Sequence, residues 1–248
     1  MAVDVHVKPR LQWRVGRVVN SQRETDSART IGLTVPGWRG HLAGQHIDLK
    51  LTAEDGYSAQ RSYSLSRPAD GERIELTVQQ IADGEVSPYL IGLVEGDEIE
   101  LRGPIGGWFV WRPAEEARVL LVAGGSGIVP LMAMLRQRVM AGASCFRLVY
   151  SVRSPADVYY AQELDRLGRE CDWLQIALVY TRSVAPQTAR PPGRIRSTDL
   201  SSTGWSSDDD VRVYICGSTG FVESVTTKLI EHGHQPSAIR TERFGPSS

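Results

Sequence analysis

The segment Arg118–Pro130 reads Arg-Val-Leu-Leu-Val-Ala-Gly-Gly-Ser-Gly-Ile-Val-Pro. Its run Val119–Ala123 is apolar without interruption, as expected of a strand that is buried on both faces of a sheet. After the glycines, apolar residues recur at helical spacing at Leu131, Met134, Leu135 and Val139. A buried strand, a glycine-rich turn and a helix in this order predict the opening unit of a parallel α/β sheet.

The same alternation continues toward the end of the chain. It predicts strands at Phe146–Val152, Gln175–Tyr180 and Val211–Cys216, and helices at Tyr159–Leu167 and Phe221–His232. Strands that alternate with helices indicate a parallel sheet with right-handed crossovers. The segment Arg182–Asp210 is rich in Ser, Pro, Thr and Arg, and we expect most of it to be a surface loop.

The residues before this unit follow a different pattern, with short β-branched and aromatic runs separated by turns such as Pro36-Gly37 and Asp55-Gly56. The runs predict strands at Leu11–Val19, Thr30–Val35, Gln45–Leu51, Arg61–Leu65, Ile74–Ile81 and Glu98–Leu101. Short strands at this spacing, with little helical periodicity, predict a closed antiparallel β-barrel. We therefore expect two domains, a barrel at residues 1–113 and an α/β domain at residues 114–248.

Composition limits the classes of function. The chain has 248 residues, 41% hydrophobic and 23% charged, and a formal net charge of −1, which is the balance of a globular enzyme and not of a nucleic-acid-binding protein. Its three cysteines are far apart, which predicts a reducing compartment without disulfides. Because the start Met1–His6 resembles no signal peptide and no long apolar run follows, we expect a cytoplasmic protein without membrane contact.

Two segments are expected at the carboxyl edge of the parallel sheet, where such sheets bind ligands. In Gly124–Pro130 the glycines let the backbone approach a ligand, and the free N–H groups of the helix attract an anion. Cys216-Gly217-Ser218 follows the last predicted strand and can face the same crevice. The alternative for the first segment is a structural turn, and for Cys216 a small buried hydrophobic residue.

Basic and aromatic residues suggest what the ligands are. On the predicted strand Arg61–Leu65, alternation places Arg61 and Tyr63 on one face, which suits a ligand with a phosphate and a flat ring. Arg153 and the pair Thr181-Arg182 follow two strands of the parallel sheet and could bind a 2′-phosphate. Each of these arginines could also be a solvated surface residue.

Taken together, these segments resemble the ferredoxin–NADP reductase family in its bacterial single-component form. The resemblance rests on Arg61-Ser62-Tyr63-Ser64, Gly84-Glu85-Val86-Ser87, Gly124–Pro130, Cys216-Gly217 and the terminal Glu242-Arg243-Phe244. It implies an FAD-binding barrel followed by a domain that binds NADP or NAD, with the two cofactors meeting between them. The chain carries no ferredoxin-type cysteine set, so an iron–sulfur centre is expected on another protein.

The resemblance also implies roles for individual residues. Arg61 pairs with the flavin pyrophosphate, Tyr63 packs on the flavin, and Ser64, with Cys216 and Glu242, forms the catalytic set at the reactive edge. The flavin site comprises Arg61, Ser62, Tyr63, Ser64, Gly84, Glu85, Val86, Ser87 and Phe244. The nicotinamide nucleotide site comprises Gly125, Ser126, Gly127, Pro130, Cys216 and Gly217, to which we add Arg153, Thr181 and Arg182 for the 2′-phosphate. Tyr160 falls in the family's Tyr-x-x-Glu-Leu segment.

The implied activity is a reductase that takes hydride from NADPH or NADH onto FAD and passes single electrons to a ferredoxin or another redox protein. FAD is favoured over FMN because the pyrophosphate segment Gly84–Ser87 is present. Two alternatives are reduction of free flavin or a quinone, and a flavin-carrying electron-transfer subunit that binds no nicotinamide. The segments Gly124–Pro130 and Cys216–Ser218 count against the second alternative, because such a subunit does not need them.

Overall fold

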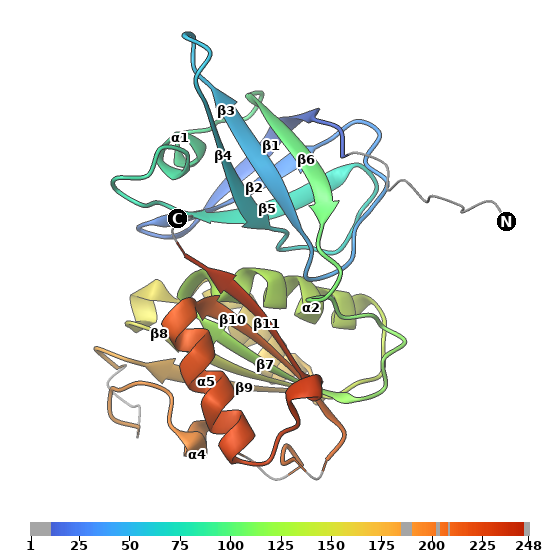
Figure 1. Ribbon diagram of the computed structural model, residues 1–248, viewed down its shortest axis with the longest axis vertical. Helices are drawn as coiled ribbons and strands as arrows, with labels where there is room; N and C mark the ends of the chain where they lie inside the picture. The colour runs from blue at the N-terminus through green and yellow to red at the C-terminus, as the bar shows by residue number, and fades with distance from the viewer. Residues whose placement is uncertain (1–10, 185–189, 202–203, 208, 246–248) are drawn as a thin grey trace, which may run out of the picture.

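The computed structural model describes residues 11–184, 190–201, 204–207 and 209–245. Two β-sheets lie one above the other, each with its own short helices, and helix α2 (Ile128–Met140) lies between them (Figure 1). The start Met1–His6, which we expected not to be a signal peptide, lies outside the described residues. Within the described ranges, no helix is long and apolar enough to cross a membrane.

The N-terminal sheet is antiparallel, as predicted, and has the strand order β4-β3-β6-β1-β2-β5. Its strands are β1 (Arg14–Thr25), β2 (Ala28–Thr34), β3 (His46–Thr52), β4 (Ser58–Ser64), β5 (Arg73–Gln79) and β6 (Glu98–Ile105). The expected barrel is not fully closed, because its edge strands meet only at an isolated bridge between Leu65 and Leu76. Helix α1 (Ser87–Ile91) begins with Pro88 in its first turn, where the missing N–H is tolerated.

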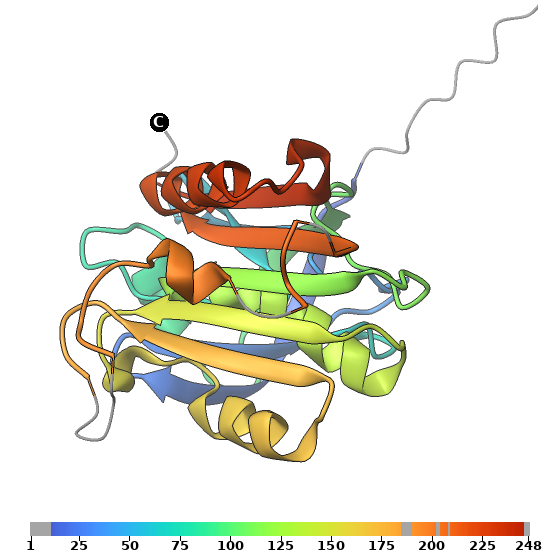
Figure 2. The ribbon, with the colours of Figure 1, turned by 90° about the horizontal axis from the view of Figure 1, so that it is seen from below.

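The C-terminal sheet is parallel, as predicted, with the order β11-β10-β7-β8-β9. Its strands are β7 (Arg118–Gly124), β8 (Phe146–Val152), β9 (Leu174–Tyr180), β10 (Val211–Ser218) and β11 (Ile239–Phe244). Figure 2 shows the four strands β7 to β10 side by side. Strand β11 was not predicted from the sequence, because Ile239–Phe244 carries charged residues at an edge of the sheet.

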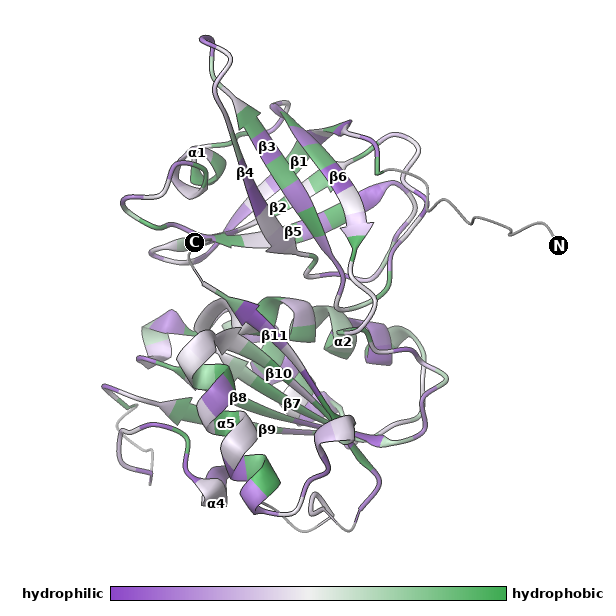
Figure 3. Cartoon of the chain, in the orientation of Figure 1, coloured by the Kyte–Doolittle hydropathy of each residue, from purple (hydrophilic) through white to green (hydrophobic). Residues whose placement is uncertain are grey.

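Helices cover both faces of this sheet. One core cluster joins β7 to α2 and α3 (Ala161–Glu170), and another joins it to α4 (Ser197–Leu200) and α5 (Thr219–Glu231). Three 3-10 turns, Gly125–Gly127, Pro155–Asp157 and Pro236–Ala238, complete the connections. Figure 3 shows mainly hydrophobic strands here, whereas β3 alternates between hydrophobic and hydrophilic residues. The continuous apolar run of β7 is therefore explained by burial on both faces.

The connection between the two sheets is itself part of a core. Strand β6 ends at Ile105 and β7 begins at Arg118, so the predicted boundary near residue 113 falls between them. Phe109, Val110 and Trp111 in this connection are buried. The cluster on the α2 face contains Ala28 and Ala43 of the N-terminal half as well as residues of the parallel sheet. The two halves thus share apolar contacts across their boundary.

Candidate functional site

The glycine turn brings the start of α2 against the backbone of β10. A Cβ built on Gly127 would lie 2.1 Å from the carbonyl oxygen of Cys216, a distance that no side chain tolerates. Gly125 has a φ of 54°, in the left-handed region that glycine adopts without strain. Both glycines are therefore required for the turn itself, and they bring the segments Gly124–Pro130 and Cys216–Ser218 together at one edge of the sheet.

A pocket of about 360 Å³ opens at this edge. Of the predicted nucleotide residues, Gly125, Ser126, Arg153 and Thr181 line it, and so does Phe244, which was assigned to the flavin. Ser218 of the predicted segment Cys216–Ser218 lines it too, whereas sequence reasoning missed Ser27, Gln79, Ser151, Asp157, Tyr159 and Phe221. Ser27 and Gln79 come from the N-terminal half, so both halves of the chain build this pocket.

The basic residues predicted for a 2′-phosphate lie at the ends of two neighbouring strands. Arg182 donates its backbone N–H to the carbonyl of Arg153 at 2.9 Å, and both side chains are exposed. Neither guanidinium forms an ion pair within the described residues. Arg153 and Thr181 line the pocket, and Arg182 is adjacent to Thr181 in the sequence. The two arginines are therefore free to approach one phosphate group.

The three predicted catalytic residues lie close together where the two halves meet. The Ser64 hydroxyl donates to Glu242 Oε1 at 3.1 Å, and Glu242 is the register partner of Cys216 on the adjacent strand. Burial raises the pKa of Glu242 to about 7, and the hydrogen bond from Ser64 opposes this by lowering the pKa. Burial, together with the Glu242 charge, raises the pKa of the Cys216 thiol. Cys216 is thus a neutral thiol and not an activated nucleophile.

The predicted flavin strand is held by a different set of contacts. Arg61 forms an ion pair with Glu85 at 3.3 Å, and the Tyr57 hydroxyl donates to the same carboxylate at 2.9 Å. Tyr63 packs against the barrel core, and burial raises its pKa to about 12. The Ser62 hydroxyl donates to Asp48 within the sheet, so it is already satisfied.

The predicted phosphate turn, Gly84–Ser87, is closed by its own hydrogen bonds. The Ile81 N–H donates to the Ser87 hydroxyl at 3.0 Å, and the Gly84 N–H donates to the Ile81 carbonyl at 2.9 Å. Val86 is buried in the barrel core, whereas Glu85 is half-exposed beside Arg61. The Ser87 hydroxyl therefore supports the turn. The predicted nucleotide residues Pro130 and Gly217 are also buried, Pro130 in the first turn of α2 and Gly217 against the Phe221 ring.

The donor groups on this face fit a flavin dinucleotide. The half-exposed Arg61 guanidinium can bind a phosphate, in competition with Glu85, because exposed ion pairs of this kind are weak. Tyr63 offers an aromatic ring, and the linked Ser64 and Glu242 offer a hydroxyl and a carboxyl group at the junction of the halves.

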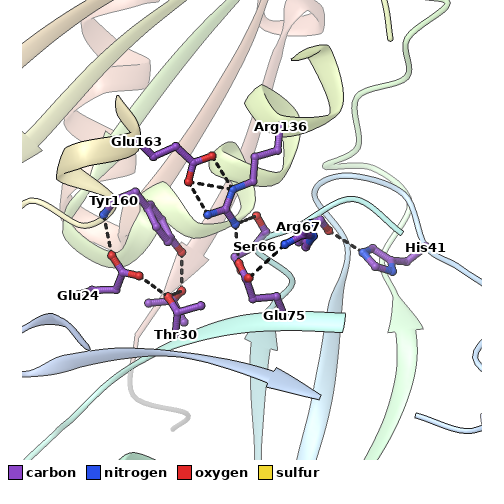
Figure 4. Close-up of polar contacts among 10 residues, drawn as sticks. Glu24, Thr30, His41, Ser66, Arg67, Glu75, Arg136, Tyr160 and Glu163 are labelled. Atoms are coloured by element: carbon purple, nitrogen blue, oxygen red, sulfur yellow. Dashed lines mark hydrogen bonds and ion pairs between the residues drawn. The ribbon is translucent and has the colours of Figure 1, made fainter. Parts of the chain in front are cut away.

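A polar cluster on the other side of the junction ties α2 to the barrel (Figure 4). The Arg136 guanidinium donates to both carboxylate oxygens of Glu163 on α3, to Glu75 on β5, and to the Ser66 carbonyl at 2.9 Å. Arg67 forms a longer ion pair with Glu75 at 3.8 Å. Because Arg136 lies on the helix that begins at the glycine turn, this cluster links that helix to β5 and to Ser66, which follows β4.

Comparisons with known proteins agree with this division of the chain. The family model of the oxidoreductase FAD-binding domain matches residues 16–110, and that of the oxidoreductase NAD-binding domain matches residues 121–227. Ferredoxin–NADP reductase B of Sorangium cellulosum is 31% identical over 188 residues, which is 74% of this chain and 76% of that protein.

Other relatives are longer proteins or parts of them. The glycine betaine monooxygenase reductase subunit of Pseudomonas aeruginosa is 30% identical over 82% of this chain and 56% of its own length. The chain thus spans little more than half the length of the first curated relatives it matches. The flavohem-like FAD/NAD-binding domain of nitric oxide dioxygenase from Vibrio cholerae is 26% identical, with a TM-score of 0.83, over 94% of this chain and 99% of that one.

Proposed function

The chain belongs to the ferredoxin–NADP reductase-like family of flavoproteins, and on this premise we propose that it is an NAD(P)H-dependent FAD reductase that supplies a redox protein with electrons. One observation carries the proposal. A pocket with a glycine turn and free arginines opens at the sheet edge where Cys216 and Glu242 lie side by side, and Ser64 of the barrel donates a hydrogen bond to Glu242. FAD, when bound, supplies the capacity to accept hydride and to release electrons one at a time.

The C-terminal residues would bind and orient the nicotinamide nucleotide. Gly125 and Ser126 offer backbone N–H groups at the start of α2, which attract its pyrophosphate. Arg153, Thr181 and Arg182 would bind a 2′-phosphate, which favours NADPH over NADH. Positioning of this kind is the main contribution of the protein, since bringing reacting groups together removes much of an activation barrier.

The residues at the junction would control protons and charge. Glu242 has its pKa near neutrality and accepts a hydrogen bond from Ser64, so it can hold or release a proton at that hydroxyl. Cys216 is a buried neutral thiol next to Glu242 and adds no charge there.

The electron acceptor is proposed to be a ferredoxin or a similar small redox protein. A naphthalene 1,2-dioxygenase system ferredoxin–NAD(P)⁺ reductase component of Pseudomonas putida is 27% identical over 93% of this chain. Its name and that of the Sorangium protein both refer to ferredoxin. The nucleotide pocket speaks against the alternative of an electron-transfer subunit that binds no nicotinamide.

The test is anaerobic titration of the purified flavoprotein with NADPH and with NADH in parallel. We expect both to bleach the visible flavin absorbance, NADPH at the lower concentration. Dithionite is the control, because it reduces flavin without needing a nucleotide site. Flavin that dithionite bleaches but neither nucleotide reduces would show that the chain is not a nicotinamide-dependent reductase.

A further inference from the structure

Tyr160 has a backbone conformation that is rare for its residue type. Its φ of 55° and ψ of 31° lie in the left-handed region, and no other non-glycine residue of the described ranges has a positive φ. It precedes α3, and its carbonyl accepts the Leu164 N–H at 2.8 Å, the first bond of that helix. A residue with a Cβ keeps this conformation only where its surroundings hold it.

The other half of the chain holds Tyr160 through a closed ring of hydrogen bonds (Figure 4). The Glu24 carboxylate accepts the Tyr160 backbone N–H at 2.9 Å and the Thr30 hydroxyl at 2.7 Å. Because Thr30 donates its only hydroxyl proton to Glu24, its oxygen accepts the Thr77 hydroxyl at 2.7 Å, and Thr77 accepts the Tyr160 hydroxyl. The direction of every bond is fixed, and the ring begins and ends on Tyr160.

Three of the four residues in this hydrogen-bond ring are shielded from water, and Glu24 is half-buried. Thr30, Thr77 and Tyr160 are 7%, 6% and 4% exposed, respectively. The Arg136 guanidinium lies 5.0 Å from the centre of the Tyr160 ring, a distance typical of a cation–π contact. Burial raises the pKa of the Tyr160 hydroxyl, so this group remains a donor across the neutral range.

The ring joins the two walls of the nucleotide pocket. Thr77 and Gln79 are two residues apart on β5 and therefore point to the same side of the sheet. Gln79 lines the pocket from the barrel, and Tyr159, the neighbour of Tyr160, lines it from the C-terminal half. A shift of the Tyr160 hydroxyl relative to Thr77 would therefore change the spacing between these two walls.

We propose that Tyr160 is a positioning residue, which through its ring with Thr77, Thr30 and Glu24 sets the spacing between the two walls of the nucleotide pocket. This inference rests on the proposed function. It concerns the nicotinamide end of the nucleotide, which must reach the junction where Ser64 of the barrel meets Glu242. The residues expected to hold the phosphates, by contrast, all belong to the C-terminal half.

This division separates positioning from simple stabilisation. Loss of the hydrogen-bond ring should slow flavin reduction at saturating NADPH, because the two walls of the pocket no longer hold their spacing. Binding of the nucleotide's phosphates should remain nearly unchanged. ADP-ribose is the probe for the latter, since it carries the pyrophosphate but no nicotinamide. A purely structural Tyr160 would instead weaken both in proportion to the loss of folded protein.

The experiment uses the holoenzyme with Tyr160→Phe. This substitution keeps the aromatic side chain and removes the hydroxyl group that closes the hydrogen-bond ring. We expect the rate of flavin reduction to fall about tenfold, as for a small misplacement of reacting groups, with the Kd of ADP-ribose within twofold of the wild type. Tyr180→Phe is the matched control, because the Tyr180 hydroxyl makes no hydrogen bond within the described residues and does not line the pocket. It should leave both quantities unchanged.

A second pair of variants guards against failure of Tyr160→Phe to fold. Thr77→Val removes the acceptor of the Tyr160 hydroxyl and should slow the reaction at least as much, whereas Thr77→Ser retains the hydroxyl and should restore the rate. Combining Tyr160→Phe with Thr77→Val should cost no more than Thr77→Val alone, because both act on one bond.

The inference is overturned if Tyr160→Phe reduces flavin within twofold of the wild-type rate, or if ADP-ribose binding weakens as much as the rate. Amide hydrogen exchange provides a readout that does not depend on turnover. Exchange around Ala28–Thr30 and Tyr159–Leu164 should be faster in Tyr160→Phe than in Tyr180→Phe. Equal exchange rates would contradict the claim that the hydrogen-bond ring holds these two segments together. If wild-type flavin is not reduced by either nucleotide, the proposed function fails, and hydrogen exchange alone then decides the positioning role.

Discussion

Replacement of Glu242 by glutamine should change how the stability of the protein depends on pH. Burial raises the pKa of this carboxyl group from the ordinary value of 4.5 to about 7. Between these values the folded chain binds a proton that the unfolded chain releases, so the free energy of unfolding falls as the pH rises through this window. The difference corresponds to a loss of roughly 3 kcal/mol at most, since one pKa unit is worth about 1.4 kcal/mol. The side chain is only half-buried, so a smaller loss is expected.

Glu242→Gln keeps the size of the side chain and removes the titration. Compared with the wild type, the variant should have equal stability near pH 4.5 and greater stability at pH 8, by up to about 3 kcal/mol. The assay is urea unfolding of both proteins, freed of flavin, at half-unit steps across this range. A wild-type stability that rises with pH in this window, or an equal slope in Glu242→Gln, would refute the assignment of a raised pKa to this residue.

Three further predictions concern the glycine turn, the junction and the nucleotide. Gly127→Ala should destabilise the fold in thermal unfolding and abolish nucleotide binding, because its Cβ would meet the Cys216 carbonyl. Gly220→Ala is the control, because its Cβ meets nothing within 4 Å. It should leave the stability unchanged or raise it by up to about 1 kcal/mol. Arg136→Met should lower the free energy of urea unfolding by about 3 kcal/mol, because it leaves Glu163 unpaired and Glu75 with only the longer Arg67 ion pair, and an unchanged midpoint would contradict this. Arg182→Ala should raise the KM for NADPH far more than that for NADH, and equal effects would remove the 2′-phosphate assignment.

Much of the architecture was predictable because its signals are local. The apolar run of β7, the glycines after it and the helical spacing of α2 occupy one short segment, and strand–helix alternation then implies a parallel sheet. The same holds for the site residues that follow strands, such as Ser126 and Arg153, since the carboxyl ends of parallel strands share an edge.

The remaining features depend on contacts between distant residues. Strand β11 is defined by its pairing with β10, and its own sequence is too polar to predict it. The contribution of Gln79 to the nucleotide pocket follows from how the two halves pack, which no local pattern encodes. Two of the missed lining residues had one signal each in the sequence. Tyr159 precedes Tyr160 of the family's Tyr-x-x-Glu-Leu segment, and Phe221 lies shortly after the Cys216–Ser218 segment.

The apolar cluster that contains Ala28 and Ala43 together with the α2 face has a consequence for cooperativity. A division of the chain at residue 113 follows the sequence pattern, yet it would cut through this shared core and expose Trp111 and its neighbours to water. The barrel would keep its own core between Val18 and Leu101, whereas the α2 face would lose the cover of Ala28, Ala43, Phe109 and Trp111. We therefore expect the two halves to unfold together, in a single calorimetric transition, because the α2 face depends on residues from both.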